Sequence, residues 1–327
     1  MSEFATKLQH LEERFTHHGD EVDRADSLPA DHLDELAALG LFGPFAPAAD
    51  GGLGLGLGEL CDVVEVLAAA CLATTFVWIQ HFRLLAGVLD PGAPPLLRDQ
   101  KSKVIDGEER GGVALGGLLP GPAKLIATTS DQGWSLSGEA PWVSGWGLVD
   151  QLFVAARGPD DTVVNFLIPA KDQPGLIATR RHLSALNASV TVRVDFDALA
   201  IPSNQMIGQV PYDPAHEAPE GLRVNGSLAL GVARRCCTLL GPTPMDDELQ
   251  RCRAGLDEAD TETMAAARAR ACELAVRASH ALAVHRGSSS VIAGDVAERT
   301  AREAALLLTF GSRPTIRRAL LEQFGAQ

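Results

Sequence analysis

The middle of the chain shows a change of pattern that constrains the fold more than any other feature of the sequence. Between residues 104 and 206, short runs rich in Val, Ile and Thr are separated by Gly, Pro and Asp. This spacing is typical of short strands joined by turns, and it predicts a compact antiparallel β domain of barrel type. The predicted strands are 113–115, 124–129, 134–136, 151–156, 162–168, 175–178 and 189–196.

Patterns of helical period precede this β domain. Apolar residues recur every three or four positions over residues 3–19 and again over 31–39, which predicts two amphipathic helices. A long apolar stretch over 60–89 predicts one or two buried helices and is interrupted by His81. A histidine in such a run is more often a hydrogen-bonded core residue than a catalyst.

Helical patterns return after the β domain, over 222–240, 261–285, 295–308 and 314–324. Four helices with short connections predict a bundle. The predicted fold class is therefore a multidomain α+β chain. Its predicted domains are an N-terminal α-helical domain (1–103), a middle antiparallel β-barrel domain (104–206) and a C-terminal four-helix-bundle domain (207–327).

Charge and composition exclude several classes of partner. The chain carries 42 acidic and 28 basic side chains, a net charge of -14, so phosphate backbones and anionic membranes would repel it. The charged N-terminus lacks the apolar core of a signal peptide, and no apolar run is expected to span a bilayer. The six cysteines form no CxxC pair, so no metal site is expected and the thiols are predicted to be reduced, in the cytoplasm.

The segment 141–147 is the strongest candidate for a binding site. Its sequence, PWVSGWG, puts an indole, a hydroxyl and a flexible backbone side by side. A flat aromatic ligand needs a stacking face, polar atoms at its edge and backbone that can approach closely. The alternative is a tight turn with two core tryptophans.

Three groups of residues occur in a distinctive order along the chain. The first is Leu28-Pro29, the run 36–43, the run 51–54, Glu65 and His81. The second is Trp142-Val143-Ser144. The third is Glu298-Arg299, Arg302-Glu303-Ala304, Phe310-Gly311-Ser312 and Ile316-Arg317-Arg318. With these groups the chain resembles the acyl-CoA dehydrogenase family of flavoproteins over nearly its whole length.

The resemblance implies the acyl-CoA dehydrogenase fold, FAD as cofactor, and α,β-dehydrogenation of an acyl thioester bound to CoA or to an acyl-carrier protein. A carboxylate would remove the α-proton while a hydride leaves the β-carbon for the flavin. Trp142 would pack on the flavin ring, and Val143 and Ser144 would meet its reactive edge. The resemblance also implies a homodimer or homotetramer. The further cofactor contacts that it implies are Leu115, Gly116, Arg286, Gly287 and Ser288.

The chain departs from the family at the catalytic base. The family usually has a Glu where this chain has Gly311. Some branches take the base from the first long C-terminal helix instead, and here that position aligns with Gly221, next to Glu220. Glu220 is therefore the candidate base. The alternative is that this carboxylate only stabilises the dipole of the helix that begins there.

The chain also lacks several residues by which the family holds the cofactor's nucleotide part. The run 116–122 lacks the polar side chains of the family's strand and loop, and 241–247 replaces an Arg-x-x-Phe-Gly segment. The family's glycine loop reads Gly287-Ser288-Ser289-Ser290 here. Arg286 and these serines could replace the missing contacts, or the serines could cap the following helix.

These departures leave two alternatives to the dehydrogenase hypothesis. One is a non-catalytic or hetero-oligomeric family member with weakened FAD binding. The other is a flavin-dependent monooxygenase on the same fold. The basic cluster Arg180-Arg181-His182 could face an anionic thioester carrier, or it could be a solvated strand end.

Overall fold

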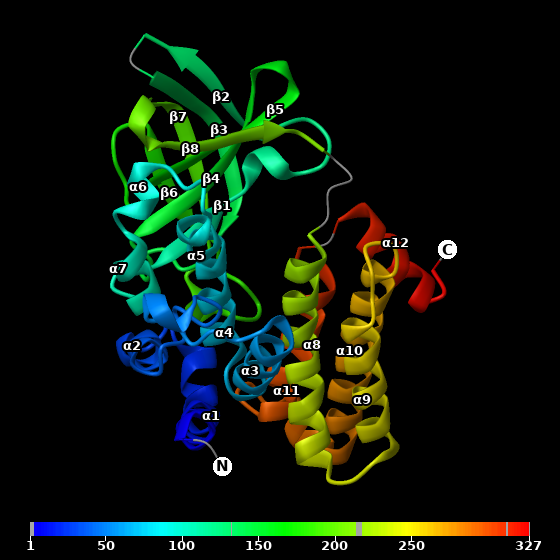
Figure 1. Cartoon of the computed structure of the whole chain (residues 1–327). Coiled ribbons are helices and arrows are strands. Elements are labelled where there is room, and N and C mark those ends of the chain that lie inside the picture. Colours follow the sequence, from blue (N-terminus) through cyan, green and yellow to red (C-terminus); the bar gives the residue numbers. More distant parts are fainter. Residues whose placement is uncertain (1–2, 132, 214–217, 312, 327) are drawn as a thin grey trace.

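The computed structural model describes residues 3–131, 133–213, 218–311 and 313–326. Figure 1 shows a β domain at one end, a group of N-terminal helices below it, and a set of long, nearly parallel C-terminal helices beside both. The predicted fold class, helices followed by a β domain and then helices, is confirmed. Two clusters of buried apolar side chains dominate the interior. One is shared by the N-terminal and C-terminal helices, and the other lies inside the β domain.

The N-terminal helices form where the apolar period predicts them. Helix α3 ends at Ala70 and α4 begins at Leu72, because Cys71 between them adopts an extended backbone (φ -146°, ψ 99°). The long apolar stretch is therefore split into three helices rather than one or two. The helices are α1 (Glu3–Arg24), α2 (Ala30–Ala38), α3 (Leu57–Ala70), α4 (Leu72–Trp78), α5 (Phe82–Leu89), α6 (Pro95–Arg98) and α7 (Lys101–Asp106).

One segment differs from the expectation that no apolar run is long enough to span a bilayer. By length and composition the window Leu72–Leu89, which covers α4 and α5, is apolar enough to do so. In the structure 67% of this window is buried inside the protein. Its apolarity is therefore accounted for by packing: the α4 side chains lie in the core shared by the helices, and those of α5 lie in a smaller cluster with α6 and α7.

His81 lies in this segment and is a hydrogen-bonded core residue, as its sequence context predicts. It is 1% exposed, its Nδ1 accepts from the backbone N–H of Gly111 at 3.0 Å, and its Nε2 lies 3.1 Å from the carbonyl oxygen of Val104. This pattern requires a neutral ring with the proton on Nε2. Burial lowers the pKa of His81 to about 4.

The β domain is one sheet with the strand order β6-β7-β3-β2-β4-β5-β8, and β1 pairs with β4. Strand β4 is parallel to both β1 and β2, whereas the other pairs are antiparallel, so the prediction of a purely antiparallel domain was wrong at this strand. Strand β8 was not predicted. The strands are β1 (Gly111–Ala114), β2 (Leu125–Ser130), β3 (Gly133–Val143), β4 (Gln151–Gly158), β5 (Thr162–Pro169), β6 (Leu176–Arg180), β7 (Val192–Pro202) and β8 (Met206–Pro211).

The C-terminal region contains one helix more than predicted. Helix α9 follows a run of prolines that suggests a loop, but Pro244 occupies the first turn, where a missing N–H costs nothing. Thr243 caps the helix through a hydrogen bond from the backbone N–H of Met245. The helices are α8 (Pro219–Leu240), α9 (Pro244–Asp257), α10 (Met264–Arg286), α11 (Val296–Thr309) and α12 (Pro314–Gln323).

A buried ion pair joins the N-terminal helices to the bundle. Arg235 on α8 is 7% exposed and pairs with Glu303 on α11. Its other N–H groups donate to the carbonyl oxygens of Ala69 at 2.7 Å and Ala68 at 3.0 Å, at the end of α3. One guanidinium thus links three helices, because it projects from α8 and its acceptors lie on α3 and α11.

We expect Glu303→Ala to lower the free energy of unfolding by about 3–5 kcal/mol, because it leaves the Arg235 cation buried without its counter-ion. Urea denaturation followed by circular dichroism measures this. Glu273→Ala is the control, since Glu273 pairs with a half-exposed arginine and should cost less than about 1 kcal/mol. An equal effect of the two changes would contradict the central role of the buried pair.

We also expect the protein to lose stability as the pH falls from 7 to 5, in part because of His81. The folded state holds this ring neutral with a pKa of about 4, whereas the unfolded chain protonates it near pH 6.5. The unfolded state therefore binds the extra proton between these values, which costs about 2 kcal/mol of stability at pH 5. Denaturation of His81→Gln across this range should show a shallower slope than the wild type; parallel slopes would rule out this origin.

Candidate functional site

The candidate segment begins at the end of β3, where the alternation of the strand sets the direction of its side chains. Val143 is fully buried in the β-domain core, and Trp142 points to the opposite face with 59% of its surface exposed. Ser144 follows directly and is 7% exposed. The structure therefore gives the segment an accessible indole next to a nearly buried hydroxyl. This excludes the alternative of Trp142 as a core tryptophan.

Arg181 holds the indole of Trp142 in place. Its guanidinium carbon lies 4.8 Å from the centre of the Trp142 ring, in a cation–π contact. Its Nε donates to the carbonyl oxygen of Pro141 at 2.9 Å. Arg180 donates to the carbonyl oxygens of Asp26 and Asn187. The two arginines of the basic cluster are thus engaged within the protein.

Helix α4 brings the Ser144 segment close to the loop that contains Gly311. A Cβ on Gly145 would lie 3.2 Å from Cγ1 of Val77 on α4. The preceding residue of α4, Phe76, packs edge-on against Phe310, with ring centroids 4.6 Å apart. Two segments that are far apart in the sequence therefore meet on neighbouring residues of one helix.

Gly311, at the family's usual base position, faces a buried arginine. A Cβ on Gly311 would lie 3.6 Å from one terminal nitrogen of Arg268 and 3.7 Å from the other. The Arg268 side chain is 1% exposed and donates to the carbonyl oxygens of Phe310 and Gly311. Here a cation fixes the loop backbone where the resemblance implies a carboxylate. The adjacent motif residue Ser312 lies outside the described residues.

Glu220 lies in the first turn of α8 and is exposed. In Figure 1 this end of α8 is the end of the bundle nearest the β domain, and the loop before α12 lies at the same end. The candidate base and Gly311 thus lie at the same end of the bundle. Glu220 also occupies the position where a carboxylate stabilises the helix dipole.

Gly116 and Gly117 pack too closely against neighbouring strands to carry side chains. A Cβ on Gly116 would lie 2.3 Å from the carbonyl oxygen of Glu139, and one on Gly117 would lie 2.5 Å from the backbone of Ala156. The preceding Leu115 is half-buried in a small apolar cluster with Phe153. This segment therefore offers backbone and apolar surface where the family has polar side chains.

The stretch after α10 is exposed and partly occupied by contacts within the protein. Arg286 donates to Asp295 at 2.7 Å, and Gly287 and Ser288 are exposed. The hydroxyls of Ser289 and Ser290 donate to the carbonyl oxygens of Arg286 and Gly287. The N-cap of α11 is Asp295, which accepts from Ala297 at 2.9 Å, so the alternative that the serines cap this helix was wrong.

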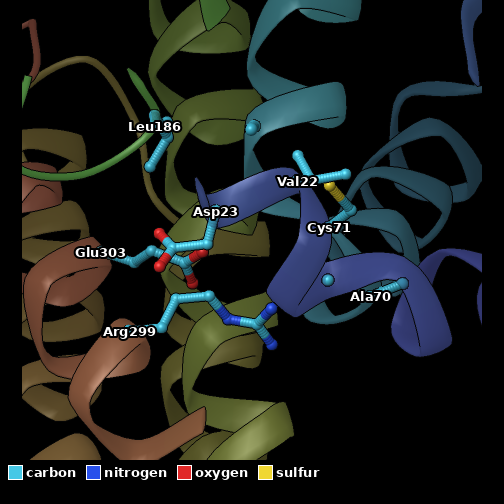
Figure 2. Close-up of a pocket in the computed structure, with 9 residues that line it drawn as sticks. Val22, Asp23, Ala70, Cys71, Leu186, Arg299 and Glu303 are labelled. Atoms are coloured by element: carbon cyan, nitrogen blue, oxygen red, sulfur yellow. The ribbon is translucent and has the colours of Figure 1, made fainter. Parts of the chain in front are cut away.

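The acidic and basic side chains of α11 that belong to the third sequence motif form ion pairs within the protein. Arg299 pairs with Asp20, and Arg302 pairs with Asp23 and with Glu298. Figure 2 shows Asp23, Arg299 and Glu303 around a small cavity that Cys71 also lines, between α1, α4 and α11. Ion pairs between neighbouring elements account for these side chains.

Sequence reasoning missed two residues in this region, Arg268 and Thr191. Arg268 lies in an Ala-rich helix, where nothing in the pattern distinguishes a buried arginine from a solvated one. Thr191 is the other, and its hydroxyl lies 2.8 Å from that of Ser144. It was placed in a predicted strand, but the signal for its contact with Ser144 is the pairing of β3 with β7, which periodicity alone does not reveal.

Comparisons with known proteins agree with this architecture. A family model for the acyl-CoA dehydrogenase N-terminal domain matches residues 6–100. Butyryl-CoA dehydrogenase from Megasphaera elsdenii has a similar structure, with a TM-score of 0.82 at 17% identity, over 100% of this chain and 98% of that one. Dibenzothiophene monooxygenase from Paenibacillus sp. A11-2 has a TM-score of 0.80 at 19% identity, over 99% and 97% of the two chains.

Two curated relatives are more similar in sequence. Benzylmalonyl-CoA dehydrogenase from Aromatoleum aromaticum is 28% identical over 238 residues, covering 68% of this chain and 62% of that protein. L-evernosamine nitrososynthase from a Micromonospora species is 29% identical over 224 residues, covering 64% of this chain and 52% of that protein. The chain thus spans less than two thirds of the length of either relative. Residues 6–100 thus match the acyl-CoA dehydrogenase N-terminal domain, and the chain as a whole has the acyl-CoA dehydrogenase fold.

We expect Gly117→Ala to lower the free energy of unfolding by about 1–3 kcal/mol, because its new methyl group would collide with the β4 backbone. The control is Gly58→Ala on α3, where a Cβ meets nothing within 4 Å. That change should stabilise the protein by up to about 1 kcal/mol, since alanine favours the helix. Chemical denaturation of both variants tests the pair; a neutral Gly117→Ala would mean that the loop moves aside easily.

Proposed function

We propose that the protein is an FAD-dependent oxidoreductase that dehydrogenates an acyl thioester at its α and β carbons. The observation that carries the proposal is the exposed Trp142 indole beside the Ser144 hydroxyl, on a segment that α4 joins to the Gly311 loop. This arrangement offers a stacking face and a polar edge next to the end of the bundle. A flat ring lying there would be in reach of side chains from both domains.

The residues of this segment fit the isoalloxazine ring of FAD. The exposed face of Trp142 would take the ring, and Arg181 would keep the indole from turning away. Ser144 would form a hydrogen bond at the ring edge. When bound, FAD supplies the two-electron acceptor that the reaction requires.

The fit is weaker for the nucleotide part of the cofactor. Leu115 and Gly116 can offer only backbone groups and apolar surface, because any side chain at 116 would collide with β3. Arg286 is already paired with Asp295, so it would bind a pyrophosphate in competition with that carboxylate. The backbone of Gly287 and the hydroxyl of Ser288 are exposed and could also bind the pyrophosphate. We therefore expect FAD to bind more weakly than a full set of polar contacts would allow.

Glu220 is the proposed base. Its carboxylate oxygen would accept the α-proton of the thioester, on the side of the substrate opposite the ring. Gly311 has no side chain for this step, and the nearby Arg268 is a cation that stays protonated. An exposed carboxylate at the end of the bundle facing the β domain is what supports the role of Glu220.

The proposal also covers the compartment, the substrate carrier, the oligomeric state and the electron acceptor. All six cysteines are free thiols, which suits a reducing compartment such as the cytoplasm. The substrate is an acyl-CoA or an acyl-carrier-protein thioester. Because Arg180 and Arg181 are engaged within the protein, we do not assign the carrier's anionic group to them. A homodimer or homotetramer, and a separate electron acceptor, complete the proposal.

A second candidate function is oxygen chemistry. The observation in its favour is Gly311, since a monooxygenase has no need of the dehydrogenase base. The monooxygenase and nitrososynthase among the similar proteins fit this candidate as well. Rapid reaction of the reduced protein with oxygen, in the presence of substrate, would favour it. A protein that cannot be reconstituted with FAD, and that gains activity only with a complete homologue, would favour a non-catalytic member instead.

The first test is spectroscopic. We expect the purified protein, reconstituted with FAD, to be yellow, and its absorbance near 450 nm to bleach when an acyl-CoA series is added without oxygen. Each thioester is compared with the free acid of the same chain length, which should leave the spectrum unchanged. No bleaching with any thioester would reject the dehydrogenase proposal.

The second test addresses the base. We expect Glu220→Gln to slow bleaching by about 10²–10⁴-fold with little change in FAD binding, because only the proton acceptor is lost. Asp247→Asn is the matched control, since Asp247 is also an exposed carboxylate in the first turn of a helix. Similar small effects of both changes would assign Glu220 to the helix dipole alone.

A further inference from the structure

The segment 181–191 holds the candidate segment through a continuous set of hydrogen bonds. The backbone N–H of Gly145 donates to the carbonyl oxygen of Ser189 at 2.8 Å, and that of Trp146 donates to Val190 at 3.2 Å. At the other end, Nε of Arg181 donates to the carbonyl oxygen of Pro141 at 2.9 Å, and the N–H of Arg181 donates within its own segment to the carbonyl oxygen of Thr191 at 3.0 Å. The two segments are therefore fixed relative to each other before any ligand arrives.

Three hydroxyl groups form a chain between these segments. The oxygen of Ser144 lies 2.8 Å from Oγ1 of Thr191, which lies 2.9 Å from Oγ of Ser189. Exposure rises along the chain, from 0% for Ser189 through 3% for Thr191 to 7% for Ser144. Only the Ser144 end approaches the surface, next to the exposed Trp142.

Burial decides which way the protons point. If Ser144 donated to Thr191 and Thr191 to Ser189, the Ser189 proton would need a further acceptor, and the described part of the chain records none for it. In the opposite direction Ser189 donates to Thr191, Thr191 donates to Ser144, and every buried donor is satisfied. Because an unsatisfied buried donor is costly, the second direction is favoured. It leaves the proton of Ser144 free to donate outward.

The backbone that presents this chain is held in an uncommon conformation. Leu186 and Val190, on either side of the turn Asn187–Ser189, have φ values of 57° and 46°. A left-handed conformation is costly for a β-branched residue such as Val190 and persists only where the surroundings require it. The contacts that require it include the hydrogen bond from the N–H of Leu28 to the carbonyl oxygen of Ala188, at 3.0 Å.

We infer that Thr191 and Ser189 are positioning residues that orient the hydroxyl of Ser144 as a hydrogen-bond donor toward the ligand on Trp142. The inference rests on the proposed function, in which that ligand is the flavin ring of FAD. Its edge must then present an acceptor to Ser144. Thr191 acts on the ligand only through Ser144, and Ser189 acts only through Thr191.

The test is a double-mutant cycle on the affinity for FAD, measured as the dissociation constant from quenching of flavin fluorescence, with the visible spectrum recorded alongside. Ser144→Ala should weaken binding about tenfold, and Thr191→Val about fivefold, with a shifted flavin spectrum, because an oriented hydrogen bond is lost. Thr191→Ser should restore binding to within about twofold. The double variant should bind no more weakly than Ser144→Ala, since both changes remove the same interaction.

Two controls separate positioning from general damage. Thr75→Val removes a buried threonine hydroxyl elsewhere, on α4, where it donates to the carbonyl oxygen of Cys71 at 2.9 Å, and should leave the affinity unchanged. Thermal unfolding of each variant reports on loss of structure. If Thr191→Val weakens binding additively with Ser144→Ala, its role is structural and the inference is wrong.

The other possible outcomes distinguish failure of this inference from failure of the proposed function. If Thr191→Val binds FAD as tightly as the wild type, or more tightly, the hydroxyls point the other way and only this inference fails. If the wild type itself binds no FAD, the proposed function fails and this inference fails with it. Tenfold weaker binding in Ser144→Ala, together with rescue by Thr191→Ser, supports both.

Discussion

The Arg235–Glu303 ion pair is the interaction on which the arrangement of the domains depends. A guanidinium removed from water needs an acceptor for every donor, and here the acceptors come from α3 and α11 as well as from its counter-ion. The N-terminal helices and the bundle are therefore fixed against each other at their common core. Helix α4, which follows α3 directly, is placed by the same contact.

The position of α4 determines the geometry of the candidate site. Val77 of α4 lies against the Ser144 segment and Phe76 lies against Phe310, so one helix sets the position of both. The hydroxyl chain and the left-handed Val190 then determine what the Ser144 segment presents. The position of the Trp142–Ser144 segment is thus set by residues outside it, on α4 and in the segment 181–191.

The sequence predicts those parts of the fold that depend on local patterns. The spacing of apolar residues predicts the amphipathic helices and the strands β1 to β7, and the apolar surroundings of His81 predict that it is buried. Helix α9 was missed because Pro244 suggests a break, although the same residue suits a first helical turn. The parallel pairing of β4 was missed because strand direction depends on contacts distant in sequence. For the same reason, family motifs locate Trp142 and Ser144, whereas Thr191 and Arg268 emerge only when separate segments are brought together.

The glycines at 116 and 117 restrict how this protein can change. Because the backbones of β3 and β4 occupy the space that a Cβ would need, no substitution can place a side chain at 116 or 117 without moving a strand. The loss of side chains at these two positions is therefore hard to reverse one residue at a time. New side-chain contacts to a nucleotide could be introduced more easily in the turn after α10, because Gly287 and Ser288 there are exposed.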